Sequence, residues 1–264
     1  MSSNRHSSRR RARRRGPEQL ELPARTWGGR RKGAGRPKSS SRHPHTRRPK
    51  VARRFPLHIT WKLEDDLPNL RGPQTARPIL AALAAARERE GFRLIHYVLE
   101  RRHLHLIVEA DSAEALSRAL RALAIRIARA INKALGRKGR VFKERYHARP
   151  LKTPTQTRHT LRYVLNNERR HREQRGQVTN RDWLDPLSSG DWFDGWRHGW
   201  KPPPAPWPVA RPATWLLREG WQRAGGLLDL NEVPGPTQAG VESRRRFAAT
   251  PARAPAGRVR CDQS

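Results

Sequence analysis

Two histidines separated by one leucine could together hold a metal ion. The run HLHLIVE starts at His103 and has the composition of a strand, in which side chains alternate between two faces. His103 and His105 then share a face, about 7 Å apart at the backbone, and two neutral imidazoles so placed can chelate one cation. Leu104 and Leu106 lie on the other face, the natural side for packing on helices. The alternative is a pair of half-buried histidines in an ordinary strand.

The spacing alone is weak evidence, because it occurs twice in a chain with 11 histidines. His43 and His45 repeat it on either side of Pro44, inside a basic segment that offers no scaffold to fix them. The surrounding pattern therefore has to decide between the two readings.

A later helix adds a phenol to the candidate chemistry. In TPTQTRHTLRYVLNNERRH (153–171), Thr153 is placed as N-cap with Pro154 at the first helical position, which predicts a helix start. At 100° per residue, Tyr163 lies nearly opposite the apolar cluster of that helix. Asn167 lies one turn beyond it, and His159 one turn before. Tyr163 is therefore either an exposed tyrosine or a functional one.

The other two tyrosines are read differently. Tyr97 falls within an apolar strand pattern and is expected in the core. Tyr146, in the basic stretch ERYHARP, is the second candidate for a reactive phenol.

The charge of the chain points to a polyanionic partner. A formal net charge of +34 over 264 residues, with 35% hydrophobic residues, favours binding to phosphate backbones, with an anionic membrane surface as the other candidate. The longest apolar run, PILAALAAA from Pro78, is too short to span a bilayer, and no signal peptide is readable. Cys261 is the only cysteine, which excludes an internal disulfide and fits a reducing compartment. We expect a cytoplasmic, nucleoid-associated protein.

Composition divides the chain into four parts. Residues 1–54 carry half of the net charge without apolar periodicity and are expected to form a disordered basic arm that binds phosphates. Residues 55–173 are patterned as a folded domain. Residues 174–235 hold seven of the nine tryptophans and a proline-rich stretch, and are expected to wrap the domain as an extension with one short helix near 213–221. Residues 236–264 are expected to be a disordered tail.

The elements of the domain follow a recognisable order. Strands are predicted at 57–63, 92–99 and from His103, with a tight turn at 100–102 that makes an antiparallel hairpin. Helices are predicted at 76–90, from a cap at Asp111 to Gly136, and from Pro154. A short strand is expected within 136–151. This order predicts an α+β, ferredoxin-like (RRM-like) antiparallel sheet with helices on one face.

A histidine–hydrophobe–histidine strand followed by a helix containing YVLNN resembles the HUH tyrosine transposases of the IS200-like class, in particular the REP-associated tyrosine transposases. The resemblance covers about Phe55 to His171 and extends to the loop GRVFKERYHARPL. Two positions depart from the family pattern. Arg102 stands where an asparagine is common, and Glu168 stands where a proline is common, which leaves the local geometry open.

The resemblance implies a chemistry and assigns residues to it. It makes His103, His105 and Asn167 ligands of Mg²⁺ or Mn²⁺, and Tyr163 the nucleophile of a DNA endonuclease and strand transferase. The tyrosine would keep the 5′ phosphate of single-stranded DNA near a hairpin and free a 3′ hydroxyl. The covalent phosphotyrosine retains the bond energy, so that rejoining needs no ATP. The protein would act as a monomer or homodimer.

Basic residues around these positions are the expected DNA contacts. Arg162, beside the tyrosine, is expected to favour its phenolate. The other candidates follow the hairpin turn and the basic loop and include Tyr146: Arg101, Arg102, Lys143, Arg145 and Arg149.

Other functions remain open from the sequence. A non-catalytic, domesticated DNA-binding protein of the same fold explains the charge equally well and predicts that replacing Tyr163 by Phe changes nothing. An RNA-recognition sheet would display aromatic residues on adjacent strands, and no such stretch is found. A transposase with a carboxylate triad needs clustered acids that this domain does not supply.

Overall fold

The computed structural model of the chain describes residues 51–197 and 199–235. All of them fall within one compact unit. Most of the predicted basic arm, with His43 and His45, and the predicted tail lie outside the described residues. Arg53, at the end of the predicted arm, is described and forms an ion pair with Asp111 at 3.0 Å.

Five antiparallel strands form one sheet in the order β2-β3-β4-β1-β5. Their bounds are β1 Leu57–Lys62, β2 Glu88–Arg89, β3 Phe92–Leu99, β4 His103–Ala110 and β5 His147–Pro150. The predicted hairpin is confirmed, because β3 and β4 pair directly. Apart from the two-residue β2, the strand order is that of a ferredoxin-like sheet, as predicted.

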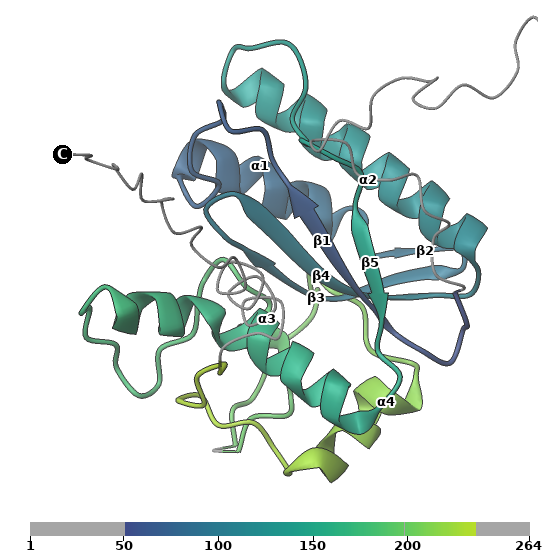
Figure 1. Cartoon of the computed structure of the whole chain (residues 1–264), viewed down its shortest axis with the longest axis vertical. Helices are drawn as coiled ribbons and strands as arrows, with labels where there is room; N and C mark the ends of the chain where they lie inside the picture. The colour runs from purple at the N-terminus through teal and green to yellow at the C-terminus, as the bar shows by residue number, and fades with distance from the viewer. Residues whose placement is uncertain (1–50, 198, 236–264) are drawn as a thin grey trace, which may run out of the picture. The chain divides into compact units, whose positions relative to one another are not determined.

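The helices cover both faces of this sheet. Helices α1 (Pro73–Ala84) and α2 (Ala113–Ala134) pack on one face, as expected. Helix α3 (Pro154–Gln174) lies on the opposite face, across the sheet from α2 (Figure 1). The α+β class is thus confirmed, whereas the prediction of helices on one face holds for α1 and α2 only. The reason is that the histidine face is covered as well, by α3 and the extension.

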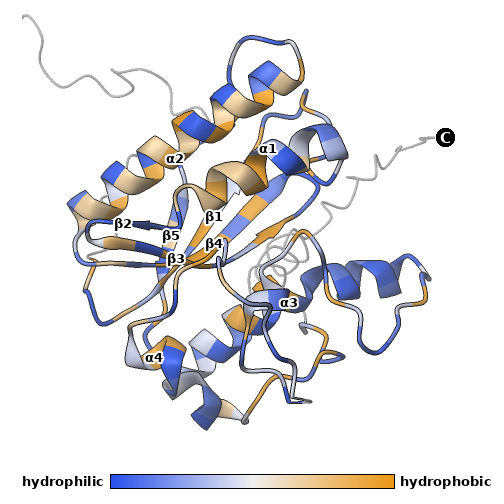
Figure 2. Cartoon of the chain, turned by 180° about the vertical axis from the view of Figure 1, so that it is seen from behind, coloured by the Kyte–Doolittle hydropathy of each residue, from blue (hydrophilic) through white to orange (hydrophobic). Residues whose placement is uncertain are grey.

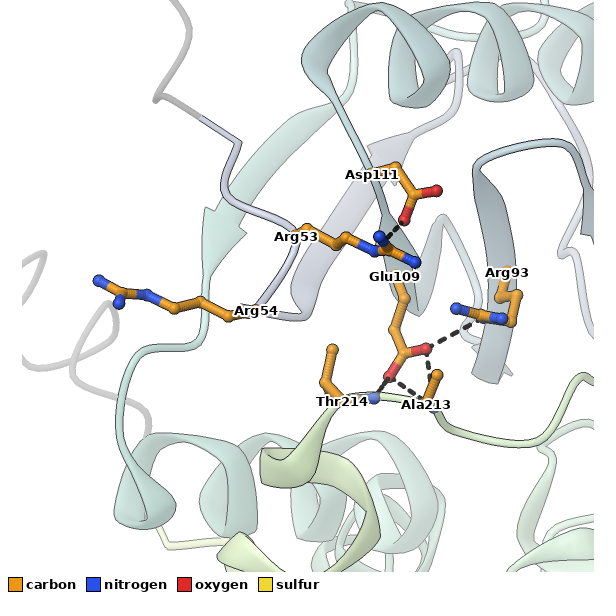
Figure 3. Close-up of a pocket in the computed structure, with 7 residues that line it drawn as sticks. All are labelled: Arg53, Arg54, Arg93, Glu109, Asp111, Ala213 and Thr214. Atoms are coloured by element: carbon orange, nitrogen blue, oxygen red, sulfur yellow. Dashed lines mark hydrogen bonds and ion pairs between the residues drawn. The ribbon is translucent and has the colours of Figure 1, made fainter.

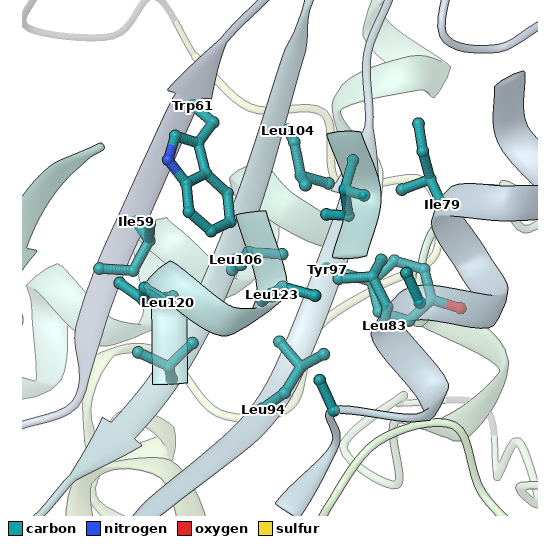
Figure 4. Close-up of a cluster of buried hydrophobic side chains, with 14 of the residues drawn as sticks. Ile59, Trp61, Ile79, Leu83, Leu94, Tyr97, Leu104, Leu106, Leu120 and Leu123 are labelled. Atoms are coloured by element: carbon teal, nitrogen blue, oxygen red, sulfur yellow. The ribbon is translucent and has the colours of Figure 1, made fainter. Parts of the chain in front are cut away.

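The core between the sheet and α1 and α2 follows the strand alternation. Ile59 and Trp61 of β1 and Leu104 and Leu106 of β4 point to this side and are almost fully buried (Figure 4). The α2 stripe meets them with buried aliphatic residues at three- and four-residue intervals: Leu116, Leu120, Leu123, Ile127 and Ile131. Tyr97 belongs to this core, as predicted.

Two helices differ from the prediction at their boundaries. Helix α1 starts at Pro73 and ends at Ala84, because the charged residues after it form β2 and pair with the start of β3. Helix α2 is capped by Ser112, whose Oγ accepts a bond from the Ala115 N–H at 3.1 Å, and not by Asp111. The predicted stop holds, since Gly136 adopts φ +60, a conformation that favours glycine.

Helix α3 starts as predicted. Thr153 Oγ1 accepts from the Gln156 N–H at 3.2 Å, and Gln156 Oε1 accepts from the Lys152 N–H at 2.9 Å. These bonds satisfy backbone donors that the first turn of a helix leaves open. The position of Tyr163 along the chain is therefore set relative to a well-defined helix start.

The extension builds a second core with α3. Apolar residues of α3, such as Leu161 and Val164, pack with Trp196, Trp221 and Leu228 from the extension. The extension also contains η1 (Gly190–Trp192), α4 (Trp215–Arg218) and η2 (Gly220–Ala224), so the predicted short helix near 213–221 is confirmed. The boundary at 173/174 stays a prediction.

The extension also closes the outer edge of β3 and is anchored to β4. The Ser189 N–H donates to the Tyr97 carbonyl at 2.9 Å, and the Ala210 N–H donates to the Leu94 carbonyl at 2.8 Å. Farther along, the Glu109 carboxylate accepts from the N–H groups of Ala213 and Thr214 (Figure 3). Edge strands are commonly covered in this way.

The hydropathy of the helices follows their packing on the two faces of the sheet. Both α2 and α3 carry hydrophilic stretches on their outer sides (Figure 2). Within the described ranges, no helix combines the length and apolarity needed to cross a membrane.

Candidate active site

Strand register places the histidine pair on the α3 side of the sheet. His103 and His105 are opposite Lys62 and Thr60 of β1, and directly paired residues of antiparallel strands share a face. On the same face His58 is opposite Arg149 of β5. The alternation predicted for HLHLIVE is confirmed, because Leu104 and Leu106 lie in the opposite core.

The Tyr163 hydroxyl reaches this face from α3. It lies 3.3 Å from Nε2 of His105, and the two rings stand edge to face with centroids 5.1 Å apart. His105 is buried and Tyr163 half-buried. One helix turn later, the buried Asn167 points to the same place. The structure thus brings together Tyr163, Asn167 and the histidine strand.

A carboxylate that sequence reasoning missed lies among them. Glu100 Oε1 accepts a bond from the Tyr163 hydroxyl at 3.4 Å and a bond from Asn167 Nδ2. Its Oε2 lies 3.7 Å from His105 Nε2. Glu100 begins the β3–β4 connection, and its N–H donates to the His103 carbonyl at 2.8 Å. Nothing in the local pattern ERR predicts that its side chain turns toward the histidines.

Arg71 ties the turn, α3 and the extension together behind the site. Its guanidinium donates to the Leu99 carbonyl at 2.6 Å and makes a bidentate pair with Asp185 at 2.8 and 2.9 Å. Its Nε lies 3.7 Å from Glu168, the residue that stands where the family commonly has proline. Glu168 also pairs with Arg175 at 2.6 Å, so this departure adds ionic contacts behind Asn167.

Two further histidines border the site. His58 Nε2 and Thr60 Oγ1 each lie 3.2 Å from His105 Nδ1, which leaves Nε2 of His105 facing Tyr163. Contacts of this kind fix the tautomer and orientation of a ligating imidazole. His171 Nε2 lies 3.0 Å from Asn167 Nδ2. The sequence could have indicated His171, because it lies one helix turn after Asn167. The position of His58 depends on the register between β1 and β4, which the sequence does not show.

The charges of the site hold its phenol protonated. Burial raises the pKa of Tyr163 above its ordinary value, and the Glu100 carboxylate raises it further. For Glu100, burial favours a higher pKa, but hydrogen bonds and charge from His105, with His171 and Asn167, lower the pKa to about 2. Burial lowers the pKa of His58 to about 3 and also lowers the pKa of His103, so both are neutral at pH 7. A bound cation would find a neutral His103 and an ionised Glu100 carboxylate.

Arg162 does not take its predicted role. Its Nη1 donates to Glu232 of the extension at 3.0 Å, so the guanidinium is held away from the phenol. The cation whose charge lowers the pKa of Tyr163 is Arg170. Position on the helix decided this: Arg162 precedes Tyr163 by one residue and therefore points about 100° away from it.

The other predicted DNA contacts divide between the two sides of the sheet. Arg149 is exposed on the histidine face. Tyr146 packs against Trp61 with ring centroids 6.1 Å apart, on the α1 and α2 side, and is not brought together with the histidines. The sheet therefore separates this second candidate phenol from His103 and His105.

The predicted contacts around the hairpin turn are exposed. Arg102 and Lys143 both bind Asp65, and Arg102 donates to its carbonyl at 2.6 Å. Arg101 and Arg145 are exposed as well. These four stay predicted DNA contacts.

The expected metal ligands fit a divalent cation in their chemistry. Imidazole nitrogens and an amide oxygen are donors that Mn²⁺ accepts, and Mg²⁺ prefers the oxygen donors. The ring centroids of His103 and His105 are 6.1 Å apart, so cation binding would require their nitrogens to turn toward each other. Within the ranges that the structure describes, no three His, Cys, Asp or Glu side chains form a ready metal site.

The similarity to known proteins covers the strands and the part of α3 that carry these residues. Residues 53–167 match the family described as "Transposase IS200 like". Among solved structures, the chain is similar to a REP-associated tyrosine transposase bound to a REP hairpin, with 19% identity, a TM-score of 0.41, and coverage of 56% of this chain and 82% of that one. It is also similar to a putative transposase from Deinococcus radiodurans, with 14% identity, a TM-score of 0.33, and coverage of 52% and 99%. No curated protein matches the chain.

Over residues 53–167, which contain the histidine strand, Tyr163 and Asn167, the chain is therefore similar to the IS200-like transposases. Transposases are enzymes that act on DNA.

Proposed function

We propose that this protein is a metal-dependent endonuclease and strand transferase for single-stranded DNA, acting through a covalent phosphotyrosine at hairpin-forming repeats. The observation that carries the proposal is the convergence of the Tyr163 hydroxyl on His105 Nε2 at 3.3 Å, from a helix and a strand 58 residues apart. The Tyr163 ring also packs against the core of α3 and the extension, but its hydroxyl meets the histidine face.

The proposed reaction transfers one phosphodiester bond to the protein. The Tyr163 oxygen attacks the scissile phosphorus and forms a bond to the 5′ phosphate, while the bond to the 3′ oxygen breaks. The phenol proton is lost to the site and the leaving 3′ oxygen gains a proton, so that a free 3′ hydroxyl results. The reverse step joins a second 3′ hydroxyl to the same phosphate without ATP.

His103, His105 and Asn167 would hold the cation in this proposal. When bound, Mg²⁺ or Mn²⁺ supplies positive charge that offsets the repulsion between the phosphate oxygens and an anionic nucleophile. The same positive charge would counter the effect of Glu100 on the Tyr163 phenol. Arg149 and the exposed turn residues Arg101 and Arg102 are proposed to follow the DNA backbone.

Covalent capture tests the proposal directly. Hairpin oligonucleotides with single-stranded flanks, labelled at the 3′ end, are incubated with the chain and Mn²⁺ and separated under denaturing conditions. We expect a labelled protein band for the wild type and none for Tyr163→Phe. The same oligonucleotides labelled at the 5′ end should release a shortened free strand and label no protein.

The matched control replaces the other candidate phenol. Tyr146→Phe should retain the labelled band, because this side chain lies on the other side of the sheet. A band that persists in Tyr163→Phe, or that is missing for the wild type across a broad panel of hairpins, would contradict the proposal. The second result would favour a non-catalytic DNA-binding protein of the same fold.

A further inference from the structure

We propose that Glu100 is itself a ligand of the divalent cation of this site, so that a carboxylate joins the two imidazoles and the amide. The inference rests on the proposed function and deepens it. Glu100 belongs to the turn before the histidine strand, and its side chain is 14% exposed.

The Glu100 carboxylate lies where the other expected ligands converge. Its Oε1 contacts the Tyr163 hydroxyl at 3.4 Å and also Asn167 Nδ2, while its Oε2 lies 3.7 Å from His105 Nε2. Its negative charge also acts on the pKa of His103, the second histidine of the pair, and raises it. One side chain therefore touches or acts on every residue expected to bind the cation or the phosphate.

A buried anion at this place calls for a positive partner. Burying an ionised carboxylate is costly unless it is paired or coordinates a metal. Among the described residues, Glu100 forms its ion pair with His105 at 3.7 Å, and Arg71, whose pKa the Glu100 charge raises, is bound directly to Asp185 and the Leu99 carbonyl. The negative charge also opposes the approach of a phosphodiester. A cation bound to Glu100 removes both conflicts.

A cation at this place requires rotations of the Asn167 amide and of the two imidazoles. Asn167 presents Nδ2 to the carboxylate, and turning its amide end for end presents Oδ1 at the same place. Glu100, Asn167 and the two histidines then supply two oxygens and two nitrogens. Six-coordinate Mn²⁺ or Mg²⁺ retains positions for water and a phosphate oxygen. The carboxylate adds ligand charge, which raises affinity for hard cations.

The experiment measures Mn²⁺ binding by the full chain without DNA, using isothermal titration calorimetry and the loss of the free Mn²⁺ electron paramagnetic resonance signal. We expect the wild type to bind one Mn²⁺ and Glu100→Gln to bind it at least about tenfold more weakly, the scale at which ligand-shell changes act. Glu144→Gln is the matched control. It removes the same charge from a residue whose field also reaches His103, and we expect a change of less than about twofold, within the scatter of surface substitutions.

A second measurement tests the inference in case Glu100→Gln does not fold. Mn²⁺ should raise the unfolding temperature of the wild type, as any ligand of the folded state does. Glu100→Asp, which keeps the charge on a shorter side chain, should show a smaller rise at the same Mn²⁺ concentration. A rise in Glu100→Asp equal to that of the wild type would contradict ligation through this carboxylate.

The outcomes separate this inference from the proposed function. If Glu100→Gln binds Mn²⁺ as tightly as the wild type, Glu100 is only a hydrogen-bond acceptor and the inference is overturned, even where the wild type forms the DNA adduct. If neither protein binds Mn²⁺, the inference is overturned as well. If binding depends on Glu100 but no adduct forms on any hairpin, the inference stands and the proposed function fails.

Discussion

At the residue scale, the imidazoles of the histidine face have different surroundings and different uses. His105 is contacted at both ring nitrogens, by His58 and Thr60 on one side and by Tyr163 on the other. His103, by contrast, is half-exposed near the turn. His96 is buried apart from the site, with Nδ1 3.0 Å from Ser189 Oγ. Because burial opposes protonation of His58 and His96, these two rings make the stability of the fold depend on pH.

The first residue-scale prediction concerns His96, whose pKa burial lowers from 6.5 to about 3. Between these pH values the unfolded chain binds a proton that the folded chain excludes. The free energy of unfolding should therefore fall as the pH drops below 6.5, by up to about 1.4 kcal/mol per pH unit from this residue. His58, with its pKa lowered to about 3, acts in the same direction and window.

Urea denaturation over a pH series measures this dependence. His96→Asn keeps a polar group near Ser189 but cannot titrate, so its stability should fall less steeply below pH 6.5 than that of the wild type. Above about pH 7, where imidazole is neutral in both states, the two proteins should show parallel pH dependence. Equal slopes below pH 6.5 would mean that His96 is protonated in the folded state.

At the scale of elements, α3 is the part that carries both the nucleophile and the amide ligand of the proposal. The extension holds this helix by ionic and backbone contacts as well as by the shared core. Arg158 donates to Glu232 at 2.6 and 2.8 Å and to the Gly226 carbonyl at 3.2 Å. Asn166 Nδ2 donates to the Asp229 carbonyl at 3.0 Å. Tyr163 is therefore positioned by residues that follow it by more than 60 places.

Glu232→Gln tests this clamp. The variant removes the charge that pairs with Arg158 and Arg162. Because hydrogen bonds to charged groups contribute about 1.5–3 kcal/mol, we expect the free energy of unfolding to fall by an amount in this range. Chemical denaturation followed by tryptophan fluorescence measures it.

An exposed ion pair provides the control for the clamp. Glu219 pairs with Arg218 at 3.6 Å, and both side chains are more than half exposed. Glu219→Gln should change the free energy of unfolding by less than about 0.5 kcal/mol. Equal effects of the two substitutions would contradict the view that Glu232 anchors α3.

At the scale of the whole molecule, the excess positive charge is available to both sides of the sheet. Exposed arginines occur on the histidine face, as at Arg149, and along α2 on the far side, as at Arg121. A net charge of +34 makes any DNA binding steeply dependent on salt. Affinity alone therefore does not identify the DNA-binding face, whereas paired substitutions on the two faces do.

Arg149→Ala and Arg121→Ala form such a pair. If single-stranded DNA lies across the histidine face, Arg149→Ala should lower the slope of log affinity against log salt by about 0.7, the value for one phosphate contact on a single strand. Arg121→Ala should leave the slope unchanged. Fluorescence anisotropy with a labelled hairpin across a NaCl series measures both. The reverse result would place the DNA on α2.

The sequence by itself determined the features that depend on local periodicity. Alternation placed His103 and His105 on one face, the cap at Thr153 set the start of α3, and the helical period placed Tyr163 and Asn167 side by side. The tertiary structure alone decided that Glu100 turns into the site, that His58 supports His105, that Arg162 binds Glu232 and that α3 covers the histidine face. Side-chain direction within a strand or helix follows from the backbone repeat. Contacts between distant segments depend on strand register, turn shape and packing, which no local pattern encodes.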